Sequence, residues 1–152
     1  MPTDLEKALS ALTVHEIRLR RANIQLVDEL EPVELKNQSM EVQGLRRIGK
    51  IKEISLKEGE EDWWEYNFFY TAGVRLVDKE KAGEPAVEIQ ATFNALYRSR
   101  EKLESGPLKS FSDEHVGYHV WPYWREYVQS TCMRMGVAPI RIPLYRVSGK
   151  GD

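Results

Sequence analysis

The sequence has a single cysteine and no long apolar run, and these two absences restrict the environment of the protein. Cys132 has no second cysteine to pair with, which excludes an internal disulfide and a thiolate zinc cage and indicates a reducing compartment. No stretch approaches the roughly 18 consecutive apolar residues that a transmembrane helix needs, and the mean hydropathy is -0.52. The first residues carry neither the basic start nor the apolar core of a secretory signal. We therefore expect a cytoplasmic protein without membrane insertion.

The sequence also lacks a basic excess and the common catalytic motifs. Its net charge is -2 and its pI is about 6.0. A phosphate-binding surface normally brings a surplus of Lys and Arg, so nucleic acid is not an expected partner. No Gly-x-Ser-x-Gly, P-loop or Gly-x-Gly-x-x-Gly pattern occurs. These absences predict a protein that is not an enzyme and that uses no cofactor.

His115 and His119 have the spacing of a metal site, because residues four apart on a helix can place two imidazoles on one ion. No glutamate occupies the His-Glu-x-x-His position, and the sequence shows no third ligand nearby. We therefore expect two packed or partly exposed histidines and no metal site.

The N-terminal part predicts a short helix and then a strand. Thr3 and Glu6 have the spacing of a capping box. In the strand that follows, the apolar residues change parity near Arg20 and Arg21, which predicts a β-bulge. Residues 27–43 are rich in charge and predict a long crossover loop, a feature that is often functional in a compact domain.

Strand-like alternation of apolar and polar residues continues in three later stretches. Residues 64–76 and 87–97 show it most clearly, and the short polar turn between them predicts an antiparallel hairpin. Residues 46–57 form a less regular strand in which one parity is shared by Ile48, Ile54 and Leu56.

Helical spacing replaces this alternation after residue 109. Ser110 or Ser112 can cap the helix, and Gly136 suits its C-terminal end. Pro122 cannot donate a hydrogen bond within a helix, so we expect a break or kink there. A short extended segment with Pro143 follows. The length suits one domain spanning residues 1–152, with a core at about 13–146 and a flexible tail at 147–152.

Trp63 and Phe69 fall on the polar parity of their strand. Apolar residues on both faces of a sheet imply cover by another subunit or by a ligand, and cover by the crossover loop is an equally good interpretation. The same aromatic pattern also fits a non-catalytic α+β domain that buries this face in a closed ligand pocket or a permanent dimer.

Three segments resemble a known family. Residues 120–128 read Val-Trp-Pro-Tyr-Trp-Arg-Glu-Tyr-Val and resemble the Leu/Phe-Pro-Tyr-x-Arg-Glu-x-Ile/Val motif of the SecB protein-export chaperones. Residues 136–139, Gly-Val-Ala-Pro, resemble the family's Gly-x-x-Pro. Residues 87–90, Val-Glu-Ile-Gln, resemble its Cys-Glu-Val-Gln strand. The order of the predicted elements over residues 13–146 is similar as well.

The resemblance implies an α+β fold, with a four-stranded antiparallel sheet and a kinked helix pair on one face, here preceded by a short extra N-terminal helix. It also implies an ATP-independent chaperone that binds unfolded or signal-bearing polypeptides in an apolar groove and assembles as a homotetramer, a dimer of dimers. By position, the client-binding residues would be Leu30, Val33, Leu35, Ile48, Ile54, Leu56, Trp124, Tyr127 and Val128. The oligomer interface would include Val87, Ile89 and Ala91, and Glu88 on the opposite face would dock the SecA motor.

The chain departs from the export chaperones in its charge. Arg18, Arg20 and Arg21 stand where the family's first strand carries acidic residues for SecA docking. The sequence also shows no equivalent of the family's acidic C-terminal helix. These departures and the extra N-terminal helix resemble the solitary SecB-like chaperones of toxin–antitoxin systems, which protect an aggregation-prone antitoxin tail. An antitoxin is therefore an expected partner beside exported precursors.

Overall fold

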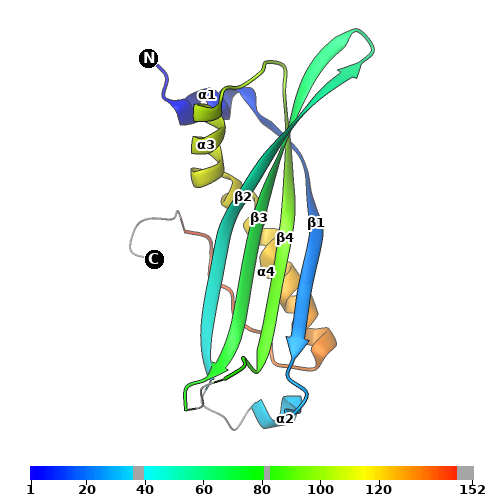
Figure 1. Cartoon of the computed structure of the whole chain (residues 1–152), viewed down its shortest axis with the longest axis vertical. Coiled ribbons are helices and arrows are strands. Elements are labelled where there is room, and N and C mark those ends of the chain that lie inside the picture. Colours follow the sequence, from blue (N-terminus) through cyan, green and yellow to red (C-terminus); the bar gives the residue numbers. More distant parts are fainter. Residues whose placement is uncertain (36–39, 81–82, 147–152) are drawn as a thin grey trace.

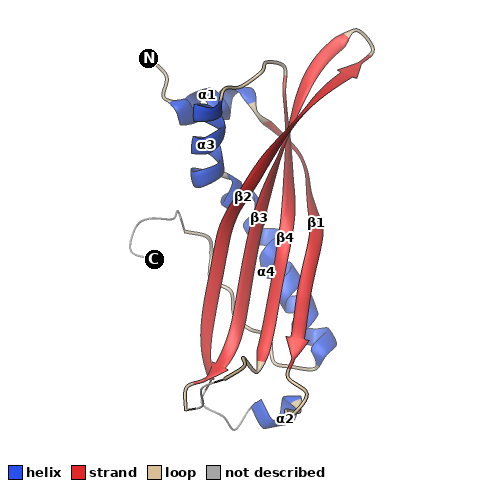
Figure 2. Cartoon of the chain, in the orientation of Figure 1, coloured by secondary structure: helices blue, strands red, loops and turns tan. Residues whose placement is uncertain are grey.

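The computed structural model describes residues 1–35, 40–80 and 83–146, and the predicted tail at 147–152 lies outside them. Figure 2 shows the helices and strands. In chain order they are α1 (Asp4–Ala11), β1 (Thr13–Leu26), α2 (Pro32–Leu35), β2 (Met40–Glu58), β3 (Glu61–Asp78), β4 (Val87–Ser99), α3 (Ser105–Glu114) and α4 (Val116–Met135).

The four strands form one antiparallel sheet in the order β1-β4-β3-β2. β2, β3 and β4 follow one another as a meander. β1 lies beside β4, so the connection after β1 crosses to the far edge of the sheet, where β2 begins (Figure 1). The described helices α1, α3 and α4 lie on one side of the sheet. This arrangement confirms the predicted α+β fold with a four-stranded antiparallel sheet and helices on one face.

Short-range signals placed the first helix correctly. The Thr3 hydroxyl accepts a hydrogen bond from the Glu6 backbone N–H at 3.1 Å, and the Glu6 carboxylate accepts one from the Thr3 N–H at 3.4 Å. This reciprocal pair is the predicted capping box. α1 then packs on α3, and Ala8 is fully buried. Because an isolated helix of this length is marginal in water, the packing on α3 is what keeps it folded.

The core lies between the sheet and α4. Every fourth residue of α4 points to the sheet, which gives the buried stripe Val116, Val120, Trp124, Val128 and Cys132. The opposing face of β3 and β4 supplies alternate residues that are also buried, namely Tyr66, Phe68, Tyr70, Ala72, Val74, Val87, Ile89, Ala91, Phe93, Ala95 and Tyr97. The strand alternation of the two clearest stretches is thereby explained, because one side of each faces this core.

A break or kink of the helix was predicted at Pro122, and a break at this residue is wrong. The two helices are separated at His115, whose φ of -130° is not helical, and Pro122 lies inside α4. Pro122 removes one hydrogen bond, to the Tyr118 carbonyl, but both residues are on the exposed side of the helix, where water can reach that carbonyl. The first helix also begins at Ser105, earlier than the predicted caps at Ser110 or Ser112.

Two bulges control which residues share a face. The bulge predicted near Arg20 and Arg21 is confirmed by a register shift between Leu19 and Arg21. A second shift, between Ile48 and Ile51 in β2, was not predicted. Because of it, Ile48 faces the helices, opposite Tyr70, while Ile54 and Leu56 face the other side, opposite Glu65 and Trp63. The three residues therefore do not share a face, which corrects the parity assigned from the sequence.

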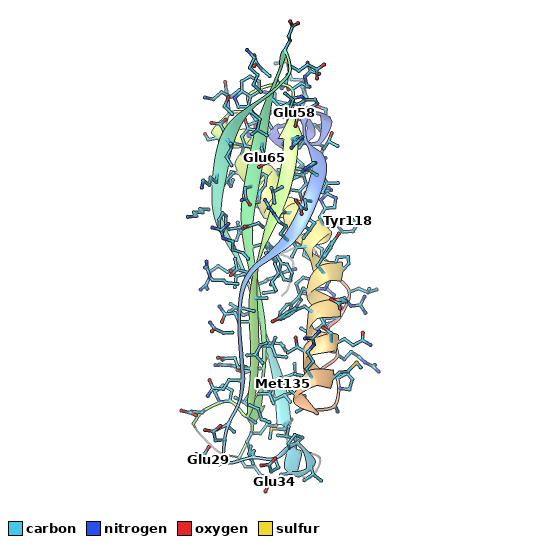
Figure 3. All side chains as sticks on the ribbon, turned by 90° about the vertical axis from the view of Figure 1, so that its right-hand side faces the viewer. Glu29, Glu34, Glu58, Glu65, Tyr118 and Met135 are labelled. Carbon is cyan, nitrogen blue, oxygen red and sulfur yellow. The ribbon has the colours of Figure 1, made fainter. Side chains whose placement is uncertain are left out.

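The second face of the sheet carries no helix among the described residues. In Figure 3 the sheet is seen from its β1 side, with α4, marked by Tyr118 and Met135, on one side only. Phe69 is nevertheless only 9% exposed, because the side chains of Arg20 and Lys50 lie over its ring at 5.6 and 4.9 Å from the centroid. Arg100 covers Trp63 in the same way, at 4.6 Å. Basic side chains thus cover these rings, a kind of cover that was not among the alternatives expected from the sequence.

Candidate client-binding groove

An apolar depression lies between β2, α4 and the C-terminal segment, residues 137–146. Its volume is about 430 Å³. β2 and β3 form one wall, Trp121 and Trp124 of α4 form the floor, and the C-terminal segment forms the other wall. Val42 is 52% exposed and Leu144 is 73% exposed, so apolar side chains from both walls remain open to solvent. We call this depression the β2 groove.

The C-terminal segment is held in place by backbone acceptors and by cations over rings. Trp121 donates its indole N–H to the Pro143 carbonyl at 2.7 Å, and Arg125 donates to the Ile142 carbonyl at 3.1 Å. Arg46 from β2 lies over the Tyr145 ring at 4.9 Å. Gly136 ends α4 in the left-handed conformation, with φ of 74°, which redirects the chain along the helix. Gly136, Pro139 and Pro143 thus produce the extended segment that forms one wall of the groove.

Two further apolar depressions border the same segment. One, of about 420 Å³, is lined by Pro32, Val33, Leu35, Met40, Leu76 and residues 136–138. The other, of about 450 Å³, is lined by Tyr118, His119, Trp121, Pro122, Arg125, Leu144 and Tyr145. The β2 groove shares Trp121 and Leu144 with the second of these. The segment therefore has apolar hollows along its length, the geometry that suits an extended apolar chain.

The crossover and β2 residues predicted to bind clients fall in different places. Val33 and Leu35 line the depression beside α2, and Leu30 is half-buried at the start of the same connection. Ile48 is partly open on the helix-facing side of β2. Ile54 and Leu56 lie on the other face of the sheet because of the bulge before them, so the structure does not bring them to the groove.

The predicted client-binding residues of α4 belong mainly to the core. Trp124 is 1% exposed and Val128 is fully buried, while Tyr127 is half-buried. The Tyr127 ring stacks on Trp124 and meets Phe93 edge to face. Trp124 also lines the floor of the β2 groove, with only 1% of its surface exposed. A client therefore cannot replace these contacts without opening the core.

The residues predicted for the oligomer interface are also in the core. Val87, Ile89 and Ala91 lie on β4, an inner strand, and are buried in the core between the sheet and the helices of the same chain. Their side chains therefore cannot contact a second copy in this conformation. The sequence assignment did not account for α4, and an oligomer interface through these residues stays a prediction. Glu88 does lie on the opposite face, as expected, beside Arg75 of β3.

Sequence reasoning missed Val42, Trp121 and Leu144. Val42 is at a position assigned to the crossover loop, because β2 begins earlier than its alternation suggested. Trp121 was considered only as the residue before Pro122. Leu144 continues the alternation of Ile140 and Ile142 in the terminal extended segment, but this alternation does not distinguish a groove wall from a core face.

His115 and His119 form an aromatic cluster with Tyr97 at the joint between α3 and α4. The two imidazoles are 4.7 Å apart and perpendicular, and His119 Nδ1 lies 2.8 Å from the Tyr97 hydroxyl. Among the described residues, no group of three or more His, Cys, Asp and Glu side chains is arranged to hold a metal ion. Burial lowers the pKa of both histidines, and the neighbouring His115 lowers the pKa of His119 further.

This cluster gives an expected pH dependence of stability. The unfolded chain binds protons on these histidines near pH ~6.5, whereas the folded chain binds them only at lower pH. Unfolding then takes up protons, so the free energy of unfolding should fall as the pH drops below about 6.5. Urea midpoints at about pH 7.5 and about pH 5.5 measure this, and a His115→Asn/His119→Asn variant should lose less stability between them. Equal losses in both proteins would contradict the assignment.

The strand order and the position of the helices define a class of fold. A four-stranded antiparallel sheet with a crossover after its first strand and helices on one face is the SecB-like arrangement. Within the described residues, no helix is both long enough and apolar enough to cross a membrane. No family model and no curated protein matches the chain.

One solved structure is similar to nearly the whole chain. The chain superposes on the Mycobacterium tuberculosis Rv1957 SecB-like chaperone, determined in complex with a ChAD peptide from the Rv1956 HigA1 antitoxin, with a TM-score of 0.73. The match covers 94% of this chain and 96% of that chain, at 14% sequence identity. The chain therefore has the SecB-like fold, as the resemblance implied.

Proposed function

We propose that this protein is an ATP-independent, non-enzymatic chaperone that holds extended segments of unfolded polypeptides in the β2 groove. The observation that carries the proposal is the row of apolar hollows along the C-terminal segment, with Val42 and Leu144 left open on opposite walls. Val33, Leu35 and Ile48 would extend this surface towards α2 and along β2. Neither a nucleotide nor a metal is part of the proposed cycle.

The energetics of such a groove suit a client that is unfolded and variable in sequence. Each large client side chain that leaves water contributes on the order of 1.5–3 kcal/mol before ordering costs are subtracted. Several hollows must therefore be filled at once, which favours an extended chain over a folded domain. An apolar wall with few fixed polar groups makes little distinction among apolar sequences.

The neighbouring structure supports the choice of client class. The Rv1957 protein is a SecB-like chaperone, and its solved complex contains a peptide from an antitoxin. We propose by analogy that the clients are an antitoxin tail or exported precursors kept competent for hand-over in the cytoplasm. Docking of SecA through Glu88 is the less favoured route, since Arg18, Arg20 and Arg21 replace the acidic residues of the family's first strand.

Assembly into a dimer or a homotetramer would use the free edge of the sheet. Val14, Leu19 and Ile24 of β1 lie on the helix-facing side, and each is about half exposed. A second copy packed beside β1 would cover this apolar row and the unpaired strand edge. The same row favours the second candidate function, a permanent dimer without a client.

An aggregation assay separates the two candidates. A chemically unfolded client diluted into buffer scatters light as it aggregates, and a molar excess of this protein should delay that rise without ATP. An apolar dye should bind the free protein and be displaced by an unfolded peptide. If aggregation is unchanged at excess and the dimer binds no dye, the permanent-dimer function is correct and the chaperone proposal is wrong.

A further inference from the structure

The uncovered face of the sheet carries two rows of basic residues. Arg18, Arg20 and Arg21 of β1 share it with Arg47, Lys50 and Lys52 of β2; we call this set the basic face. The strand register places Arg18 and Arg21 opposite Asn94 and Thr92 of β4, and places Arg47 and Lys52 opposite Thr71 and Asn67 of β3. Arg20 and Lys50 both lie over the Phe69 ring, so they point the same way. α4 packs on the other side.

The two rows leave a neutral strip between them. β1 and β2 are the outer strands, and three strand spacings of ~4.8 Å separate them by about 14 Å. The strip between the rows is made by Asn67, Phe69, Thr71, Thr92 and Asn94, all uncharged. These five residues are buried, and Arg20 and Lys50 reach inward over the Phe69 ring. One α-helix, about 10–12 Å across, or one extended segment would therefore lie over the strip and on these two side chains, with the remaining basic residues on each side.

The polar groups of this strip are incompletely paired. Thr71 and Thr92 bond to each other at 2.8 Å, and Arg20 donates to Asn94 Oδ1 at 3.4 Å. Asn67 Oδ1 and Asn94 Nδ2 are buried and have no hydrogen-bond partner among the described residues. A buried polar atom without a partner destabilises the folded state, so a ligand that displaced the covering side chains and reached these amides would supply the missing hydrogen bonds.

Most of the basic side chains also lack an acidic partner. Glu16 lies 3.7 Å from Arg18, and Glu65 on the same face is paired with Arg98 at 3.6 Å. Across the described ranges, no ion pair involves Arg20, Arg21, Arg47, Lys50 or Lys52. The chain as a whole has a net charge of -2. Positive charge is therefore concentrated on this face of a slightly acidic protein.

The geometry points to a second binding surface: the basic face docks an acidic polypeptide segment of a partner, with carboxylates along both sides of the segment. Arginine pairs with carboxylates through two parallel hydrogen bonds, and rows on both sides would fix the segment along the strip. Nucleic acid fits less well. A base needs an exposed ring to stack on, and Phe69 is covered by Arg20 and Lys50.

Fluorescence anisotropy with a labelled peptide of about 12 residues, alternating Glu and Ala, tests this inference on the full chain. The peptide should bind to the protein, and raising the salt from about 50 to about 200 mM should weaken this binding. The variant Arg21→Glu/Arg47→Glu/Lys52→Glu should bind at least about tenfold more weakly, because three charge pairs become repulsive. A peptide with Gln in place of Glu should not bind.

The matched control is Lys7→Glu/Lys57→Glu/Arg134→Glu, which makes the same change in net charge at exposed sites outside the basic face. Equal weakening in both triple variants would overturn the inference, and so would tighter binding of a labelled oligothymidine than of the acidic peptide. Client aggregation should be delayed equally by wild type and by both variants, because the β2 groove is on the other side. The result therefore does not depend on the proposed chaperone function.

Discussion

Replacing Trp124 with alanine is expected to lower the free energy of unfolding by about 3–5 kcal/mol. Trp124 is the largest of the fully buried side chains among the described residues, and it lies between α4 and the sheet with 1% exposure. Its removal takes away the stacking on Tyr127 and leaves a cavity that the close-packed strands cannot fill. Urea denaturation followed by far-ultraviolet circular dichroism measures the loss without relying on tryptophan fluorescence.

Tyr123→Ala is the matched control for this substitution. Tyr123 precedes Trp124 on the same helix but is exposed, so its loss should cost less than about 1 kcal/mol. Both variants must be compared at the same protein concentration, because assembly adds to apparent stability. If Trp124→Ala unfolds at the same urea concentration as Tyr123→Ala, Trp124 is a groove residue and not a core residue.

The double substitution Val42→Asn/Leu144→Asn is expected to weaken client binding at least about 100-fold. Both side chains are open to solvent on facing walls of the β2 groove, so folding does not depend on them, whereas a bound client would cover them. Each change removes an apolar contact and leaves an amide without a partner under the client, at about 1.5–3 kcal/mol each. Asparagine is preferable to aspartate, since Arg46 and Arg141 beside the groove would pair with a new carboxylate.

Leu9→Asn/Met133→Asn provides the control for the groove variant. These two side chains are exposed to a similar degree, 43% and 70%, but lie on α1 and on the outer side of α4. Anisotropy of a labelled unfolded peptide gives the affinity of each protein, and unchanged urea midpoints would show that folding is intact. Equal client affinity in the groove variant and the control would place the binding surface elsewhere.

Several features of the fold could be predicted from local signals in the sequence. The Thr3 and Glu6 capping box and the left-handed Gly136 depend on neighbouring residues only, and both were predicted. The bulge at Arg20 and Arg21 was visible because apolar residues on both sides of it reported the change of parity. Features that depend on a few consecutive residues can thus be inferred before any packing is known.

Features that depend on packing were not predictable in this way. The bulge in β2 lies between Ile48 and Ile51, and the parity of Ile51 predicted only an irregular strand there. Ile54 and Leu56 were assigned to the groove by their position in the family resemblance, which does not take account of a bulge. Pro122 was expected to break the helix, but the packing of Val120 and Trp124 on the sheet outweighs one missing hydrogen bond. Trp124 and Val128 were placed at the site by the family resemblance, and periodicity could not correct this because it does not distinguish a core residue from a groove wall.

The irregularity in the middle of β2 lets one strand serve two surfaces. Its first half, before Gly49, helps to wall the groove on the α4 side, and Lys50 and Lys52 after it extend the positively charged surface behind the sheet. Removing a single residue at this point would restore regular pleating, and every later side chain of β2 would turn to the opposite face of the sheet. Two surfaces facing opposite directions therefore rely on one additional residue for their separate composition.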